Sequence, residues 1–107
     1  MWVRYGYFIG TVKPENRAEF DAFCDSKARE QLLKYPGIRQ VRILRARWHE
    51  EGVPGIYQTF ELTFDSKEAI DVMLQSPERT AMGQLMGQIM HLFEGHTKHI
   101  NYEVTAA

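Results

Sequence analysis

An arginine and a glutamate in two neighbouring strand-like segments are the first candidates for chemistry. Segments 38–48 and 56–64 flank a loop that contains Gly and Pro, a pattern typical of a β-hairpin. Centring the loop near Gly52 places Arg45 diagonally across from Glu61, within reach of an ion pair. Two interpretations stay open: a pair that fixes strand register or dimer specificity, or a carboxylate held ionised by Arg45 that accepts a proton from a substrate.

His99, in the C-terminal segment, is the third candidate catalytic residue. In the expected strand order one strand separates it from Glu61, so the two groups would lie about 10 Å apart and act together only across a ligand. A metal site is not expected. His96 and His99 are three residues apart in a strand and point to opposite faces, and His91 belongs to a helix end.

Aromatic and methionine side chains could line an apolar pocket for a ring or a hydrocarbon. The candidate pocket residues are Tyr7, Tyr57, Trp48 and Met86. Such residues more often belong to a core or an interface, and that alternative stays open. Cys24 lies on the apolar face of a predicted helix and is expected to be an inert buried thiol. No Gly-rich phosphate motif is present, so no cofactor is expected.

The first half of the chain reads as a strand, a helix and the hairpin. Residues 3–12 are aromatic and β-branched, which favours a strand. Pro14 suits a first helical position, and apolar residues then recur at helical spacing until Pro36-Gly37. The hairpin of residues 38–64 follows.

The second half reads as a broken helix and a closing strand. Asp65 and Glu68 have the spacing of a capping box, and Ser76-Pro77 restarts the helix, which is expected to end at Gly95. Its apolar stripe comprises Met82, Leu85, Met86, Ile89, Met90 and Phe93. Residues 96–104 form the last strand. The sequence therefore predicts one α+β domain over residues 1–107, of ferredoxin-like βαββαβ order.

This order puts the helices on one face of a four-stranded antiparallel sheet and leaves the other face open. Apolar side chains in segment 56–64 alternate with Tyr, Thr and Glu61, and Ile100 and Tyr102 are expected opposite His99. The open face would then carry Tyr, Thr, Arg and His. That mixture suits a semi-polar interface, so a homodimer through the open sheet face is predicted.

The composition excludes several classes of partner. The 13 Lys and Arg nearly balance the 14 Asp and Glu among 107 residues, so no strong field attracts nucleic acid or a membrane. One cysteine excludes an internal disulfide, and no apolar run approaches the roughly 20 residues that span a bilayer. The near-neutral charge favours a small-molecule ligand. No signal segment is recognisable, so a cytoplasmic location is expected.

Four junctions between elements carry a family resemblance. They are Tyr7-Phe8-Ile9-Gly10 through Pro14, Leu32-Leu33-Lys34-Tyr35-Pro36-Gly37-Ile38, Phe64-Asp65-Ser66-Lys67-Glu68-Ala69 and Ser76-Pro77-Glu78. With these junctions the chain resembles the dimeric α+β barrel superfamily, and within it most closely the EthD-like (ethyl tert-butyl ether degradation) family. The resemblance implies a catalytic or accessory part in small-molecule oxidation, in catabolism or secondary metabolism.

Two functions follow as hypotheses. The first is a cofactor-independent oxidoreductase of monooxygenase type, or an isomerase, that acts on an apolar substrate between sheet and helices through Glu61, His99 and Arg45. The second is a non-catalytic accessory or ligand-binding protein of a degradation pathway. They differ in whether the three side chains converge on a cavity with shifted pKa values or satisfy one another at a flat interface.

Overall fold

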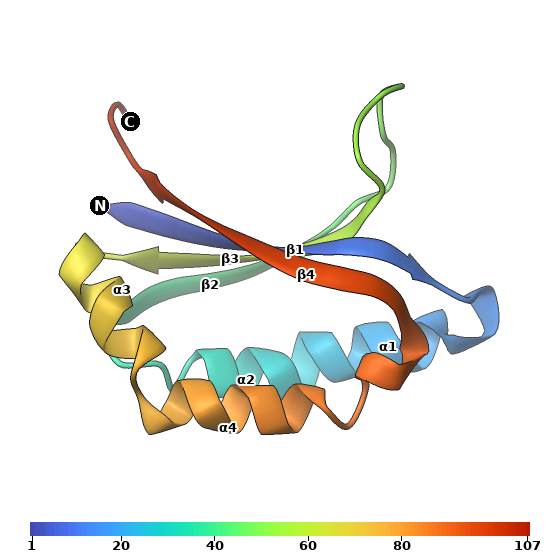
Figure 1. Cartoon of the computed structure of the whole chain (residues 1–107), viewed down its shortest axis with the longest axis horizontal. Helices are drawn as coiled ribbons and strands as arrows, with labels where there is room; N and C mark the ends of the chain where they lie inside the picture. The colour runs from blue at the N-terminus through green and yellow to red at the C-terminus, as the bar shows by residue number, and fades with distance from the viewer.

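The computed structural model describes all 107 residues and confirms the predicted βαββαβ order (Figure 1). In chain order the elements are β1 (Trp2–Val12), a 3₁₀ turn (Pro14–Asn16), α1 (Arg17–Phe23), a π-helical turn (Cys24–Ala28), α2 (Arg29–Leu32), β2 (Ile38–Arg45), β3 (Ile56–Phe64), α3 (Lys67–Leu74), α4 (Pro77–Met86), a 3₁₀ turn (Met90–Leu92) and β4 (Phe93–Glu103). None of the helices is long and apolar enough to cross a membrane.

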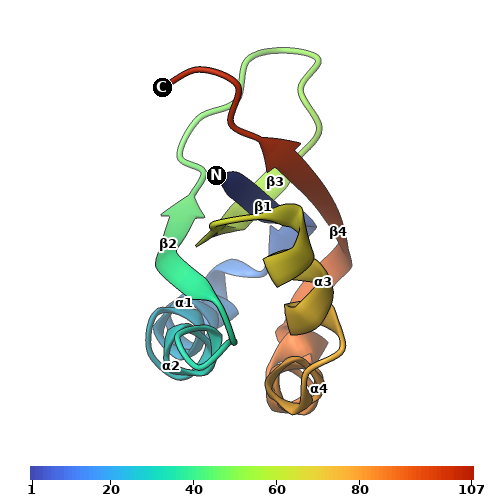
Figure 2. The ribbon, with the colours of Figure 1, turned by 90° about the vertical axis from the view of Figure 1, so that its left-hand side faces the viewer.

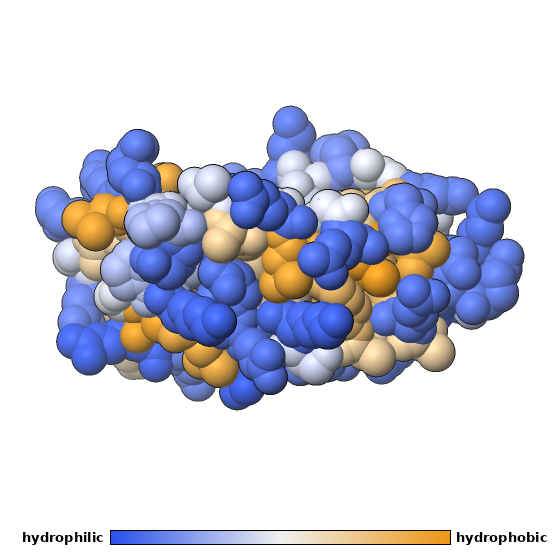
Figure 3. All heavy atoms as spheres, turned by 90° about the horizontal axis from the view of Figure 1, so that it is seen from below, coloured by the Kyte–Doolittle hydropathy of each residue, from blue (hydrophilic) through white to orange (hydrophobic).

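The four strands form one antiparallel sheet in the order β2-β3-β1-β4. Figure 2 shows α1, α2 and α4 side by side beneath one face of this sheet, with α3 at its end. The β2–β3 loop and the C-terminus project from the opposite side (Figure 1). The core lies between sheet and helices, and its most completely buried large side chains are Phe20, Phe64, Ile70 and Met73. Figure 3 shows the outer side of the helical layer as mostly hydrophilic, with hydrophobic patches between charged residues.

The first helical stretch begins at Pro14, as predicted, because the missing N–H of proline costs nothing there. A π-helical turn at Cys24–Ala28 separates α1 from α2. After α2, Gly37 adopts a φ of 76°, a left-handed conformation that glycine enters without strain, and the chain turns into β2. This stretch covers the part of the sheet that contains β2 and β3 (Figure 2).

The second helical region differs from the prediction at both ends. The first cap is Ser66, whose Oγ accepts a hydrogen bond from the Ala69 amide at 3.1 Å, rather than Asp65. Helix α4 restarts at Ser76-Pro77 as expected but ends at Met86, followed by Gly87, so the predicted end at Gly95 is wrong. Glycine is a poor helix former, and the chain from Phe93 gains strand hydrogen bonds with β1 instead.

Two glycines fix the register between β1 and β4. Gly10 and Gly95 are paired across the strands, and both have a φ of 151°. A Cβ at Gly10 would lie 2.1 Å from the Glu94 carbonyl oxygen, and one at Gly95 would lie 2.1 Å from the Ile9 carbonyl oxygen. Only glycine fits at this close approach. The same register places His99 opposite Gly6 further along the strands.

The faces of β4 are the reverse of the prediction. His99 and Thr97 face the helical side and line a cavity there, whereas Ile100 and Tyr102 lie on the open face of the sheet. Alternation along a strand separates two sets of side chains but does not say which set meets the helices. On the open face, the Tyr102 ring packs edge-on against Tyr5 of β1, with centroids 5.3 Å apart.

Candidate functional site

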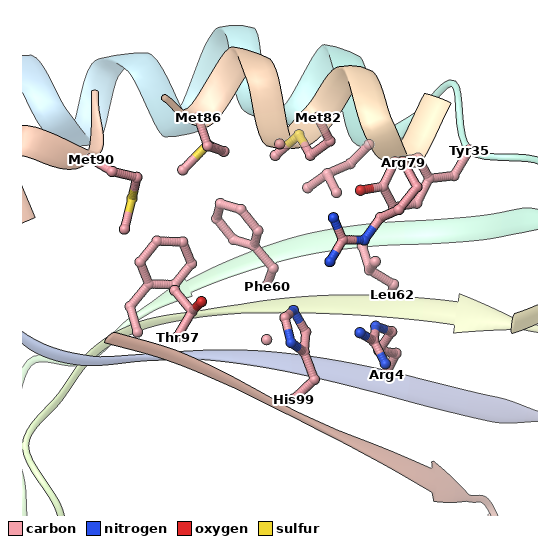
Figure 4. Close-up of a pocket in the computed structure, with 14 residues that line it drawn as sticks. Arg4, Tyr35, Phe60, Leu62, Arg79, Met82, Met86, Met90, Thr97 and His99 are labelled. Atoms are coloured by element: carbon pink, nitrogen blue, oxygen red, sulfur yellow. The ribbon is translucent and has the colours of Figure 1, made fainter. Parts of the chain in front are cut away.

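A cavity of about 190 Å³ lies between α4 and the strands β1, β3 and β4 (Figure 4). Its apolar wall includes Phe8, Phe60, Leu62, Met82, Met86 and Met90. Its polar groups are few: Arg4, Arg79, His99, Thr97 and Tyr35. Concave, largely apolar sites with a few convergent polar groups are the usual setting for small-molecule binding.

Two simple periodicities bring these residues together. Arg4, Gly6 and Phe8 alternate along β1 and therefore share the face that meets the helices. On α4, Arg79 and Met86 are seven residues apart, two helical turns, with Met82 between them on the same side. Sheet and helix thus each contribute one arginine to the cavity.

Arg4 is a buried cation with a single side-chain partner. It is 9% exposed, and its Nη1 donates a hydrogen bond to Asn101 Oδ1 at 2.9 Å. Burial, and then the positive charge of Arg79, lower the pKa of Arg4. Burial also raises the pKa of the Tyr35 hydroxyl, which is therefore a neutral donor at physiological pH. The cavity wall contains no carboxylate.

The imidazole of His99 lies against the backbone of Gly6 at the edge of the cavity. A Cβ at Gly6 would come within 3.2 Å of His99 Cδ2 and 3.3 Å of Nε2. Although the residue is exposed at the cavity mouth, its ring is partly desolvated there. Desolvation, together with the charges of Arg4 and Arg79, lowers the pKa of His99 to about 4. The imidazole is therefore neutral at physiological pH and free to accept a proton.

The predicted pair of Arg45 and Glu61 does not form. In the structure Arg45 lies opposite Gln58 and Arg42 lies opposite Glu61, one residue away from the predicted register. A slip of one residue moves a side chain to the other face of a sheet. Arg45 consequently faces the helices, while Glu61 lies on the open face.

On that open face, Glu61 is held by two neighbours. Arg42 Nε and Nη2 donate to its carboxylate at 2.6 and 3.1 Å, and the Tyr5 hydroxyl donates at 2.8 Å. Hydrogen bonds from Arg42, and secondarily from Tyr5, lower the pKa of Glu61. Glu61 and His99 therefore lie on opposite faces of the sheet and cannot share a ligand within one chain.

Arg45 joins a separate polar cluster beneath the sheet. Its side chain, 12% exposed, contacts Asp21 at 3.2 Å and Asp25 at 3.0 Å and donates to Gln58 Oε1 at 2.9 Å. Gln58 Nε2 in turn lies 3.3 Å from the sulfur of Cys24. Cys24 is buried, and burial raises its thiol pKa to about 11, as expected for an inert thiol.

Of the four predicted pocket residues, Met86 lines the cavity. Tyr57 sits at a β-bulge in β3 and points to α1, where its hydroxyl donates to Asp21 at 2.6 Å. Tyr7 lies on the open face, with its hydroxyl 2.9 Å from that of Tyr102. Trp48, in the β2–β3 loop, is 80% exposed.

Sequence analysis missed the two arginines of the cavity. Arg79 continues the methionine stripe of α4 by one helical turn, and Arg4 alternates with Gly6 on β1, so both positions were visible in the patterns. Their convergence was not visible, because it depends on how α4 crosses the sheet. No three His, Cys, Asp or Glu side chains cluster closely enough to hold a metal ion.

Comparison with known proteins gives similarity in structure only. No family model matches the sequence, and no curated protein matches it. An EthD family protein from Bacillus halodurans superposes with a TM-score of 0.76 and 18% identity, covering 98% of this chain and 99% of that chain. A candidate antibiotic biosynthesis monooxygenase from Deinococcus radiodurans gives a TM-score of 0.65 and 18% identity over 100% and 95% of the two chains.

A third solved structure is a dimeric protein of unknown function with a ferredoxin-like fold from Bacteroides fragilis. It superposes with a TM-score of 0.61 and 15% identity over 96% of each chain. At these identities the similarities concern the fold, and they confirm the resemblance to the EthD family at that level. The chain therefore has a ferredoxin-like α+β fold, as these three proteins do.

Proposed function

We propose that this protein binds a compact, largely apolar molecule in the cavity beneath α4 and transforms it without a cofactor, with His99 as proton acceptor. The observation that carries this proposal is the neutral imidazole at the edge of a largely apolar cavity whose few polar groups, Arg4 and Arg79 among them, lie beside it. The neutral imidazole has a free nitrogen lone pair that can accept a proton, and a pKa of about 4 makes it a weaker base than an ordinary histidine until an opposite charge binds beside it. The sequence-based candidates Glu61 and Arg45 have no part in this chemistry, because neither lines the cavity.

The reaction that fits is a monooxygenation that begins with proton transfer. His99 takes a proton from an activated CH₂ group, and the resulting carbanion passes electrons to O₂. The carbon ends as a carbonyl and the second oxygen atom leaves as water, so that R₂CH₂ and O₂ become R₂C=O and H₂O. Between these states the carbanion and O₂ form a C–O bond, and the resulting peroxide takes back the proton from His99. Loss of the second C–H proton as the O–O bond breaks then forms the carbonyl, and the two protons leave with the second oxygen atom as water. In support, proteins of the same fold include candidate monooxygenases.

A ligand-binding protein without catalysis is the second candidate function. The placement of Glu61 favours it, because this carboxylate is held by Arg42 and Tyr5 on the face away from the cavity. His99 is then the one candidate proton acceptor of the cavity, with no carboxylate beside it. Under this alternative the cavity would bind and carry a pathway intermediate.

We further infer that the protein forms a homodimer through the open sheet face. Leu44, Ile100 and Tyr102 are large apolar side chains exposed on that face or at its edge. Beside them lies the polar group of Glu61 and its partners, which suits a semi-polar interface. The similar protein from Bacteroides fragilis is described as dimeric, which supports this arrangement.

Oxygen uptake tests the catalytic proposal. We would screen single-ring compounds with an activated CH₂ group in an oxygen electrode and analyse the products after reaction with ¹⁸O₂. Replacing His99 by Gln should reduce turnover by about 100-fold or more, the usual contribution of a general base. His96→Gln is the matched control, since His96 is exposed on the same strand and does not line the cavity.

Each outcome of this screen has a distinct meaning. One ¹⁸O atom in the product, with turnover lost only in His99→Gln, supports the enzyme. Binding of compounds without any turnover supports the ligand-binding protein instead. Equal turnover in both variants removes His99 from the mechanism.

A further inference from the structure

The two arginines of the cavity differ from those of the neighbouring sheet edge. Arg39, Arg42 and Arg45 on β2 each pair with a carboxylate. Neither Arg4 nor Arg79 forms an ion pair, and the cavity wall contains no Asp or Glu. The cavity therefore carries two positive charges, one buried and one half-exposed, with no carboxylate within ion-pair distance.

An uncompensated buried charge is costly, so this arrangement needs a reason. Arg4 has five N–H donors, of which one is hydrogen-bonded to Asn101. Taking a guanidinium out of water without a counter-ion is unfavourable, and the repulsion from Arg79 adds to that cost. A bound anion would supply an opposite charge and would accept hydrogen bonds from the guanidinium groups.

The polar and apolar groups occupy different parts of the cavity. Figure 4 shows Arg4, Arg79 and His99 close together, while Met86 and Met90 lie further along the cavity beyond Phe60. A ligand that fills the space must therefore be charged at one end and apolar at the other. The size of the ligand follows from the volume: a protein cavity of about 150 Å³ holds benzene, and this one measures about 190 Å³.

We propose that the substrate class of this cavity is a small aromatic or similarly compact carboxylate, whose anionic group binds between Arg4 and Arg79. This inference rests on the proposed function, since it concerns the same cavity. Its apolar part then packs against Phe60 and the methionines of α4. The bound anion also faces His99, where it offsets the two positive charges and makes the imidazole a stronger base.

The methionines provide a direct measurement of binding. Three of the five, Met82, Met86 and Met90, line the cavity, while Met73 is buried elsewhere and Met1 is exposed at the N-terminus. With ¹³C-labelled methionine methyl groups, NMR titration would compare benzoate with neutral benzamide, cationic benzylamine and benzene. We expect benzoate to shift the three cavity methyl signals at the lowest concentration, and the Met1 and Met73 signals to stay in place.

A charge variant tests the role of the arginine. Arg79→Met removes one cation from the cavity and should weaken benzoate binding about tenfold or more, the value of a charge-assisted hydrogen bond. Arg79→Lys should retain part of the affinity. Arg29→Met is the matched control, because Arg29 is exposed on α2 and outside the cavity.

The outcomes separate this inference from the proposed function. Benzamide or benzene that binds as tightly as benzoate overturns the anionic substrate class but leaves the apolar cavity as a binding site. Unchanged benzoate affinity in Arg79→Met also overturns it. If none of the four compounds shifts a cavity methyl signal, the proposed function fails as well.

Discussion

The imidazole of His99 rests on the backbone of Gly6, its register partner across β1 and β4. The absence of a side chain at position 6 leaves the space that the ring occupies at the edge of the cavity. This contact holds the proposed proton acceptor beside Arg4 and Arg79, where desolvation and the charges of the two arginines lower its pKa. The geometry of the site thus depends on one glycine.

Substituting Gly6 by Ala should displace His99. The new Cβ would lie 3.2 Å from His99 Cδ2, closer than ordinary contact, so the ring must shift by a few tenths of an ångström away from β1. We expect benzoate binding to weaken several-fold and the free energy of unfolding to change by less than about 1 kcal/mol. Titration calorimetry and urea denaturation measure the two quantities. Gly55→Ala is the control, since nothing lies within 4 Å of a Cβ there; an equal loss in both variants would contradict this role of Gly6.

The pKa of His99 should be about 4 in the ligand-free protein, against an ordinary value of about 6.5. The charged groups that face it are Arg4 on β1 and Arg79 on α4, and no carboxylate lines the cavity. NMR titration of the imidazole measures this pKa directly. We expect it to rise in Arg79→Met and when benzoate binds, and to stay unchanged in Arg29→Met. A ligand-free pKa near 6.5 would contradict the desolvation of the ring and the influence of the two arginines.

The same shift gives stability a defined pH dependence. Because the folded-state pKa is lower, the unfolded chain binds more protons in the acidic range, and His99 opposes folding there. Its contribution is neutral above about pH 6.5 and becomes unfavourable as the pH falls toward 4. Urea denaturation at several pH values should show a smaller loss of stability over this interval in His99→Gln than in the unchanged protein. Equal slopes would contradict the shift.

A charge on the open sheet face should separate the proposed dimer. Ile100, 47% exposed on β4, would be buried between two sheets, so Ile100→Lys would place an unpaired ammonium group in the interface. Light scattering should report a dimer for the unchanged protein and a monomer for this variant. Val72→Lys is the control, because Val72 is 61% exposed on α3, outside the sheet. A monomeric unchanged protein would contradict the proposed dimer.

The ion pairs of Arg45 and Arg39 should differ in their contribution to stability. Arg45 is largely buried between Asp21 and Asp25, so Arg45→Met removes the cation that pairs with both carboxylates and the hydrogen bond to Gln58, and should cost about 1–3 kcal/mol of unfolding free energy. Arg39 pairs with Asp65 in an exposed position, where water and salt screen the attraction, so Arg39→Met should cost less unfolding free energy than Arg45→Met. Equal costs in urea denaturation would mean that burial does not distinguish the two pairs.

Local chemistry in the sequence determined the order and most of the ends of the elements. Pro14 starts the first helical stretch and Ser76-Pro77 starts α4, because the backbone requirements of a helix start are met by a few residues. The alternation of apolar and polar side chains in β3 was likewise predictable from the sequence. So was the methionine spacing on α4, from which Met86 was predicted to line a pocket. These features depend on neighbours in the chain, so a sequence suffices to predict them.

Tertiary structure decided the hairpin register and the orientation of β4. The β2–β3 pairing differs by one residue from the predicted register, so that Arg42 rather than Arg45 lies beside Glu61. The pairing of β1 with β4, in which Gly10 lies opposite Gly95, places His99 on the face that meets the helices. Both choices depend on contacts between distant segments. The alternation of side chains along a strand is the same whichever of its two faces meets the helices, so the sequence pattern does not choose between them. Only the packing of α4 over β1 brings Arg79 into the same cavity as Arg4.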